Sequence, residues 1–180
     1  KNILLKGNKR NYLKEMGESS REALIELPNT AQPGQWSIDQ QERLALAEKM
    51  IESTKQIRKK IEQMKKLSSR NSYTLEVYQR VNEIVELTPK ILLALRGFDH
   101  ASNIEERIIE KSKILQLQKD FYRLRDEVEK TYSKTRIIHK PINYILDQDH
   151  HHHLANQLHD FDWQFFPELL LFDIISKELW

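Results

Sequence analysis

A run of four histidines, His150 to His153, with His159 shortly after it, is the first candidate for chemistry. Imidazole nitrogens bind zinc and other transition metals, and histidines three or four residues apart on a helix can share one ion. Four consecutive side chains point in different directions around a helix, so at most two reach one metal unless Asp149, Asp160 or Asp162 completes the set. No His-Glu-x-x-His motif is present. A solvated or partly packed helix start is therefore favoured over a metal site.

Two adjacent carboxylates, Asp126 and Glu127, are the second candidate, because paired carboxylates hydrolyse glycosidic bonds. They lie in a helical pattern among Arg123, Arg125 and Lys130. Ion pairing between residues one turn apart is the ordinary explanation of such a pattern. The sequence has no Gly-x-Ser-x-Gly nucleophile elbow and no glycine-rich phosphate loop. We therefore predict no catalytic residue, no metal ligand and no cofactor for this chain.

Aromatic side chains that could stack on sugar rings form the third group. Such residues more often anchor a core or an interface, so packing is favoured over a ligand-binding or interdomain surface. The residues concerned are Trp36, Trp163, Trp180, Tyr73, Tyr78, Phe165 and Phe166.

Composition limits the class of protein. The chain has 180 residues, enough for one domain, with only four glycines, five prolines and 31% charged residues, which favours long helices. A net charge of +2 does not indicate a nucleic-acid partner. There is no cysteine, and no apolar run approaches the about 20 residues of a membrane-spanning helix. The compartment stays open, and a start at Lys1 without a signal-peptide pattern suggests a segment of a larger protein.

The first third of the chain should form two helices. One is expected over roughly residues 10–27, before a proline- and glycine-containing linker from Pro28 to Trp36. Ser37 and Gln40 match a capping box, which predicts that a long helix begins there and runs to about residue 67. Its basic outer face is interpreted as solvated surface, because acids interrupt it and no aromatic residue lies among the bases; these are Lys55, Arg58, Lys59, Lys60, Lys65 and Lys66.

The central helix follows a polar turn at residues 68–72. Eight residues recur at alternating spacings of three and four and predict one buried line; they are Thr74, Val77, Val81, Ile84, Thr88, Ile91, Leu95 and Phe98. Pro89 lies inside this pattern and predicts a kink, since the line keeps its phase beyond it. Both Val81→Asp and Leu95→Asp are expected to unfold such a helix by burying an unpaired charge.

Two further helices complete the pattern. Ser102 and Glu105 match a second capping box, opening a helix that ends near Arg136, and the sequence over 137–142 indicates an extended connection. A last helix over 165–175, with Pro167 in its first turn, is apolar on nearly every side. It should be buried or cover another domain.

These elements predict an all-α fold, a bundle of four to five helices with two or three long antiparallel ones. Residues 1–36 would form an N-terminal helix and linker, 37–136 a three-helix core, and 137–180 a helical segment packed on that core. All three parts would belong to one structural domain.

The stretch from Asn71 to Tyr78, Asn-Ser-Tyr-Thr-Leu-Glu-Val-Tyr, running on to Leu92-Leu93 and Ala101, resembles the helical region after the catalytic barrel in bacterial hexosaminidases of glycoside hydrolase family 20. Those tails have an Asn-Arg-Tyr-Ser-Leu-Glu-Val start, a second long helix and a closing segment similar to Asp162-Trp-Gln-Phe-Phe-Pro167. Here Leu87-Thr-Pro89 stands where the family tail has a basic, histidine-bearing turn.

The resemblance implies a non-catalytic accessory domain of a larger bacterial protein that hydrolyses N-acetylhexosaminides. In that family the catalytic Asp-Glu pair lies on the barrel, which this chain lacks, so no catalytic residue is transferred to it. The partner would be the barrel of the parent chain or another protein, with no nucleic acid and no membrane. A free-standing helical module that binds a protein is the alternative.

Overall fold

The chain folds as an all-α bundle. The computed structural model describes residues 3–6, 24–70, 72–132, 134 and 165–179. The described part contains no strand, only an isolated antiparallel bridge between Leu5 and Leu24. Its helices are α3 (Gln35–Asp39), α4 (Gln41–Leu67), α5 (Ser72–Val85), α6 (Leu87–His100), α7 (Ile104–Tyr132) and α9 (Phe166–Glu178).

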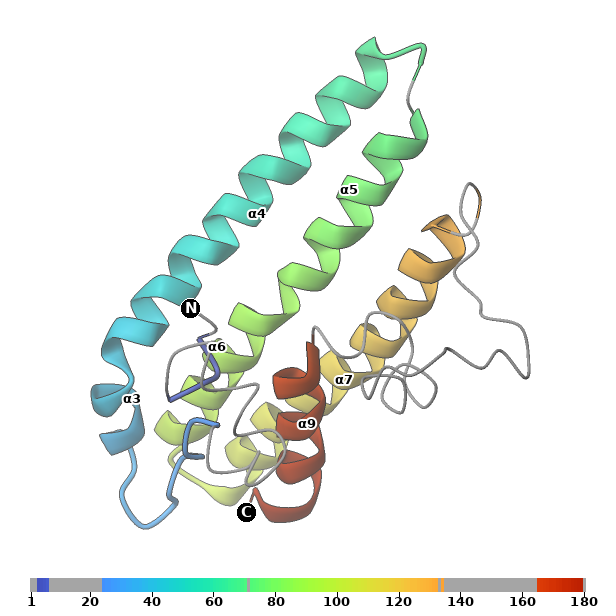
Figure 1. Cartoon of the computed structure of the whole chain (residues 1–180). Helices are drawn as coiled ribbons and strands as arrows, with labels where there is room; N and C mark the ends of the chain where they lie inside the picture. Colours follow the sequence, from blue (N-terminus) through green and yellow to red (C-terminus); the bar gives the residue numbers. More distant parts are fainter. Residues whose placement is uncertain (1–2, 7–23, 71, 133, 135–164, 180) are drawn as a thin grey trace, which may run out of the picture.

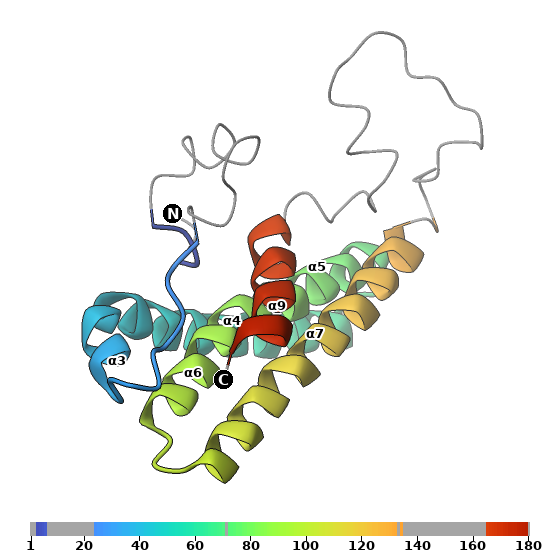
Figure 2. The same cartoon turned by 90° about the horizontal axis from the view of Figure 1, so that it is seen from below.

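The helices form two layers. In the first, α4 runs antiparallel to α5 and α6, which in turn run antiparallel to α7 (Figure 1). The long helices α4 and α7 have 27 and 29 residues, as the sequence pattern predicts. The second layer consists of α9 and the N-terminal segment, which lie on one face of the first layer near α3 and α6 (Figure 2). Among the described residues, this second layer lies over one end of the helical layer.

Helix α6 is at the centre of the core. It packs against α3, α4, α5 and α7. Leu95 is fully buried, and α9 contributes Leu171, Phe172 and Ile175 to the same apolar cluster. The buried apolar residues of α6 are Leu87, Ile91, Leu92, Leu95 and Phe98. The second half of the predicted buried line is thus confirmed.

The first half of that line is not core, which corrects the sequence prediction. Thr74 is exposed, Val77 is half-buried and 39% of Val81 is exposed, whereas burial is complete from Ile84 onward. Among the described residues, α9 and the N-terminal segment lie over the α6 end of this face (Figure 2). Val81 is therefore not a fully buried position, and we expect Val81→Asp to be tolerated better than Leu95→Asp.

The run predicted as one helix kinked at Pro89 is divided into two helices, α5 and α6. The boundary between α5 and α6 falls at Glu86, whose φ of −67° and ψ of −19° keep the backbone helical. Pro89 has no N–H to donate to the carbonyl of Val85, so the helical hydrogen-bond ladder is interrupted just before the proline. The two helices therefore follow one another along one direction.

Ser37 is bonded to Asp99 of α6, and not to Gln40 as the first predicted capping box required. Ser37 does not begin the long helix but lies in α3, and its N–H and hydroxyl both donate to Oδ2 of Asp99, at 2.8 and 2.7 Å. Gly34 provides the N-cap of α3 with a φ of +82°, a conformation that glycine adopts without strain. A carboxylate at a helix N-terminus satisfies donors that have no partner within the helix. The buried Asp99 thus attaches α3 to α6.

The second capping box is shifted by one residue. The Asn103 Oδ1 accepts a hydrogen bond from the Glu106 N–H at 2.9 Å, and the Glu106 carboxylate accepts one from the Ser102 N–H at 2.7 Å. Glu105 takes no part in this exchange. The start of α7 is thus capped by Asn103 in place of Ser102, and the glutamate bond that a capping box returns to the cap residue goes here to the Ser102 N–H.

The N-terminal part departs most from expectation. The helix predicted over 10–27 does not include its last residues, because Leu24 pairs with Leu5 in the isolated bridge. Arg43 of α4 donates to the carbonyl oxygens of Ile3 and Leu5 at 2.9 and 2.7 Å. Buried apolar side chains and one arginine thus fix this segment on α4. The rest of the predicted helix lies outside the described residues.

The apolar C-terminal helix is buried in the bundle itself. Pro167 and Glu168 lie in the first turn of α9, as predicted. Leu171 and Phe172 are buried, and the Glu168 carboxylate accepts a hydrogen bond from the Thr88 hydroxyl of α6 at 2.7 Å. This helix therefore completes the core of the chain.

A comparison of substitutions at Leu95 and Val81 tests which of the two positions belongs to the core. Leu95→Ala should cost about 2–5 kcal/mol of unfolding free energy, because it leaves a cavity in a fully buried site. Val81→Asp should leave the protein folded, since the side chain already meets water. Urea denaturation followed by circular dichroism measures both. Loss of the helical signal in the Val81 variant would contradict the burial described.

Removal of the Asp99 carboxylate tests the attachment of α3. Asp99→Ala should cost about 1–3 kcal/mol, because the buried donors of Ser37 lose their acceptor. Asp126→Ala is the matched control, since that carboxylate is mostly exposed. Chemical denaturation of the two variants should give a clear difference, and equal stabilities would show that the cap contributes nothing.

Candidate functional site

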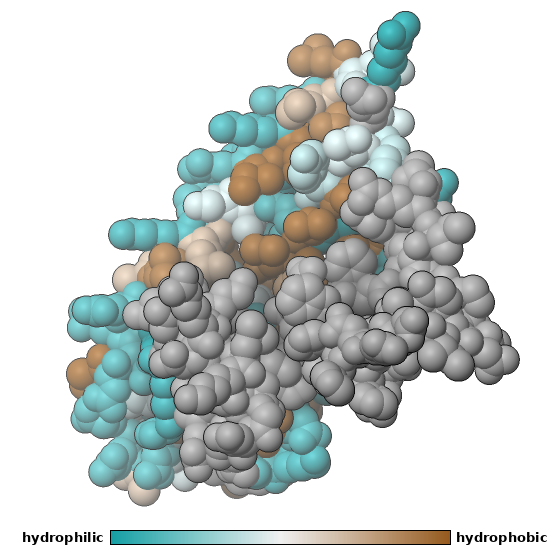
Figure 3. All heavy atoms as spheres, in the orientation of Figure 1, coloured by the Kyte–Doolittle hydropathy of each residue, from teal (hydrophilic) through white to brown (hydrophobic). Residues whose placement is uncertain are grey.

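An apolar groove between α4 and α5 is the most distinctive feature of the surface. It encloses about 970 Å³, and its wall on α4 includes Leu46, Met50, Ile57, Ile61, Met64 and Leu67. Its wall on α5 is formed by Thr74, Leu75, Tyr78, Val81, Asn82 and Val85. Figure 3 shows apolar atoms gathered along these two helices in the half of the molecule away from α3.

Helical spacing produces the two walls. On α5, Thr74, Tyr78, Val81 and Val85 follow one another at steps of four and three, so they form one row along the helix. The three-four row from Thr54 to Met64 on α4 divides between two environments. Thr54 and Ile61 are buried, whereas Ile57 and Met64 remain exposed in the groove. Both rows therefore include apolar side chains that are not buried in the core.

The floor of the groove is fixed by one polar contact. The Asn82 side-chain amide donates to the backbone carbonyl of Thr54 at 3.0 Å, and both residues are buried. Leu75 and Ile61 are buried beside them. Because a buried amide needs its hydrogen bond, this contact sets the register of α5 against α4. The groove is thus a fixed feature of the helix pair.

Its side chains are more exposed than ordinary packing requires. The exposed fractions are 60% for Tyr78, 53% for Met64 and 45% for Ile57. Full burial of one such side chain is worth about 1.5–3 kcal/mol, and roughly half of that is left unused in the groove. Contiguous apolar surface of this kind marks a protein or ligand interaction site.

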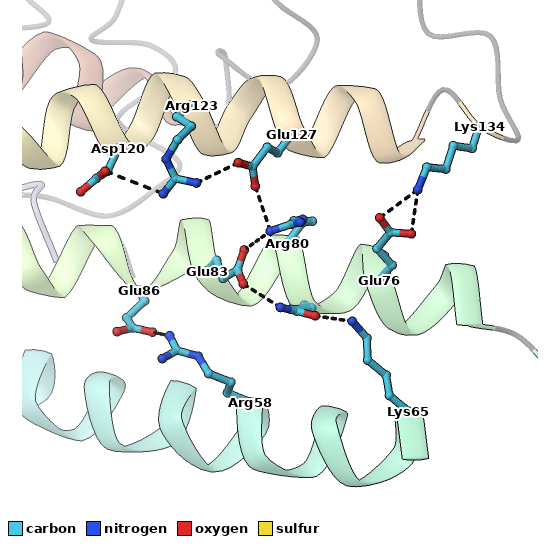
Figure 4. Close-up of polar contacts among 11 residues, drawn as sticks. Arg58, Lys65, Glu76, Arg80, Glu83, Glu86, Asp120, Arg123, Glu127 and Lys134 are labelled. Atoms are coloured by element: carbon cyan, nitrogen blue, oxygen red, sulfur yellow. Dashed lines mark hydrogen bonds and ion pairs between the residues drawn. The ribbon is translucent and has the colours of Figure 1, made fainter. Parts of the chain in front are cut away.

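The opposite side of α5 is ionic. Glu76, Arg80 and Glu83 are offset by two residues from the apolar row, about 200° around the helix. Arg80 pairs with Glu83 at 2.9 Å and with Glu127 of α7 at 2.8 Å (Figure 4). Burial acts to lower the pKa of Arg80, but the hydrogen bond from its guanidinium to Glu83 and the nearby carboxylates raise it overall. The guanidinium thus joins α5 to α7 as a cation.

Three further ion pairs connect the layer. Glu86 is buried and pairs with Arg58 of α4 and, at 2.8 Å, with Lys90 of α6. Lys134 reaches Glu76 at 2.9 Å, and this hydrogen bond holds the pKa of the Glu76 carboxyl below its ordinary value (Figure 4). Arg58, taken from the sequence as part of a solvated face, therefore connects two helices. The polar contacts hold α4, α5 and α7 together without using the groove.

The candidate carboxylates belong to this ionic network. Glu127 pairs with Arg123 at 2.8 Å as well as with Arg80, and Asp126 pairs with Arg125 at 3.0 Å. The predicted ion pairing one turn apart is confirmed by the Arg123 contact. Both carboxylates have a structural partner, and they do not face a shared cleft.

The aromatic candidates separate into core and surface. Trp36 is buried and its indole N–H donates to the Glu26 carbonyl at 2.6 Å. Phe165 packs edge-on against Phe121 with ring centroids 5.5 Å apart. Tyr78 is the aromatic residue that faces the groove. Trp163 and Trp180 lie outside the described residues.

The histidine candidates, His150 to His153 and His159, also lie outside the described residues. Within the described ranges, no group of three or more histidine, aspartate or glutamate side chains is placed to hold a metal ion. None of the helices in the described part of the chain combines the length and apolar character needed to cross a membrane.

The groove was missed by sequence reasoning. Thr74 and Val81 lie on the predicted core line, so periodicity alone assigned them to the core, and Tyr78 was considered only among the aromatic residues. The sequence does show how long the apolar row of α5 is. That length could have been compared with the length of the apolar segments available to pack on it. Coverage depends on where α9 and the N-terminal segment pack, and local sequence does not specify this.

Polar substitution inside the groove should be nearly neutral for folding. Ile57→Gln is expected to change the unfolding free energy by no more than about 0.5 kcal/mol, because the site is already partly in water. Ile91→Gln, at a fully buried position of α6, should cost several-fold more. Urea denaturation of both variants measures the contrast, and a large loss for Ile57 would mean that the groove is part of the core.

Comparisons of the chain with protein-family models, with curated proteins and with solved structures gave no match. The geometry of the groove is therefore the main basis for a functional conclusion.

Proposed function

We propose that this chain is a non-catalytic helical domain that binds another protein surface through the α4–α5 groove. The observation that carries the proposal is the pair of exposed apolar rows, which include Ile57, Met64, Tyr78 and Val81. Their burial against a second surface would gain the apolar transfer energy that the chain leaves unused. The buried Asn82 contact supports this, because it provides a preformed shape.

The partner we propose first is a catalytic barrel in the same parent protein. The support for it is the resemblance of the Asn71 to Tyr78 stretch to the tail of bacterial family 20 hexosaminidases. Hydrolysis of N-acetylhexosaminides would then belong to the barrel, and this domain would stabilise or position it. The pairing of Asp126 and Glu127 with arginines agrees with a structural role for the chain.

A free-standing interaction module is the second candidate, and the same groove supports it. The two differ in the gene, because the first requires a barrel encoded upstream in the same reading frame. The second requires a complete gene of about this length. An upstream region without a barrel would exclude the glycosidase parent and leave the module.

The accessory role predicts that groove substitutions matter only in the parent protein. Ile57→Gln should lower the unfolding free energy of the parent by about 1–3 kcal/mol while leaving the isolated chain unchanged, because only the parent buries the side chain. Ile109→Gln on α7 is the matched control, since that residue is exposed and lies outside the groove. Thermal denaturation of the parent and of the chain measures both effects.

Hydrolysis provides a second readout. The parent should release 4-nitrophenol from 4-nitrophenyl N-acetyl-β-glucosaminide, whereas the isolated chain should not. Equal effects of Ile57→Gln and Ile109→Gln in the parent would contradict docking through the groove. Turnover by the isolated chain would contradict the non-catalytic role.

A further inference from the structure

The shape of the groove restricts the kind of element that can fill it. Its two walls are rows of side chains at steps of three and four, the arrangement that accepts the apolar stripe of a third helix. From Leu46 to Leu67 the α4 wall extends about 31 Å, the length of a helix of about 20 residues. The row from Thr74 to Val85 covers about half of that length.

The groove begins where the chain's own second layer stops. Arg43 binds the carbonyl oxygens of Ile3 and Leu5, so the N-terminal segment covers α4 at that level. Leu46 follows Arg43 by less than one turn and is the first groove residue of α4. The groove thus continues an interface that already packs a second layer on this face, and another apolar element can extend that layer.

Two lysines along the α4 side of the groove favour an acidic partner over a basic one. Lys49 is the charged residue in the groove lining. Lys60 lies about three turns further along the same side of α4. Neither lysine has an ion pair with another of the described residues. A carboxylate on the partner would meet these two cations without opposition, because no acid lines the groove.

We infer that the groove binds an amphipathic helix of a protein partner, with its apolar stripe between the two rows and carboxylates along the edge that faces Lys49 and Lys60. This inference rests on the proposed function and adds the secondary structure and the charge of the docked element. The apolar rows provide affinity, and the lysines determine the orientation of the helix and exclude a basic partner.

A pair of synthetic peptides tests the inference. Each is a capped helix of about 20 residues with leucines at three-four spacing, and one edge carries glutamates in the first and lysines in the second. Fluorescence anisotropy with the full chain should show that the glutamate peptide binds about tenfold more tightly. The preference should shrink in about 0.5 M salt, because salt screens exposed charges.

Matched variants locate the contact. The double variant Lys49→Glu, Lys60→Glu should reverse the preference, whereas Lys59→Glu, Lys66→Glu, with the same change of net charge, should keep it. Ile57→Gln should weaken both peptides about tenfold, and Ile109→Gln should leave both unchanged. This comparison separates groove binding from general attraction to the net charge.

Several outcomes would overturn the inference. Equal affinity for the two peptides would contradict the claim that carboxylates of the partner face Lys49 and Lys60. Equal effects of the two double lysine substitutions would contradict it as well. Light scattering that showed a dimer dissociated by Ile57→Gln would identify a second copy as the occupant. If the parent protein is nevertheless destabilised by Ile57→Gln but not by Ile109→Gln, the docking function stands and only the acidic helix is wrong.

Discussion

The burial of one broad side of α6 is the constraint on which the rest of the structure depends. Its buried leucines and Phe98 lie on that side, and α3, α4, α7 and α9 each provide part of their cover. Two buried carboxylates at its borders reinforce this arrangement, because Asp99 holds α3 and Glu168 of α9 accepts from Thr88. Elements distant in the sequence are thus drawn to one end of the molecule.

This concentration of packing leaves α5 incompletely covered. The helix continues α6 in direction, and the described part of the second layer lies over α6. Its attachment combines the buried Leu75 and Ile84 with the Asn82 hydrogen bond to α4. Ion pairs of Arg80 with Glu127 of α7 and of Glu76 with Lys134 lie on the opposite side of the helix from the apolar row. Ion pairs at partly exposed sites contribute little to the free energy of unfolding. They therefore do not replace the stabilisation that apolar burial would give. The groove is the consequence, a preformed apolar surface beside a stable core.

Local sequence patterns predicted the helices much better than their environments. The all-α class, the long α4 and α7 and the buried part of the central helix from Ile84 follow from spacing, proline position and composition. The two capping boxes were misassigned, because Ser37 takes its partner from Asp99, far away in the sequence, and Asn103 competes with Ser102 one residue away. Val81 and Leu95 share one helical row, yet only tertiary packing makes Leu95 a core residue.

The most direct test of the claim that the groove is an open binding surface uses the absence of cysteine from the chain. A single thiol introduced by Met64→Cys should react with a maleimide as fast as one introduced by Ile109→Cys on the isolated chain, since both positions are about half exposed. Addition of the bound partner, or incorporation into the parent protein, should slow the first reaction and leave the second unchanged. A slow reaction at position 64 in the isolated chain would contradict the account, because the groove would already be filled.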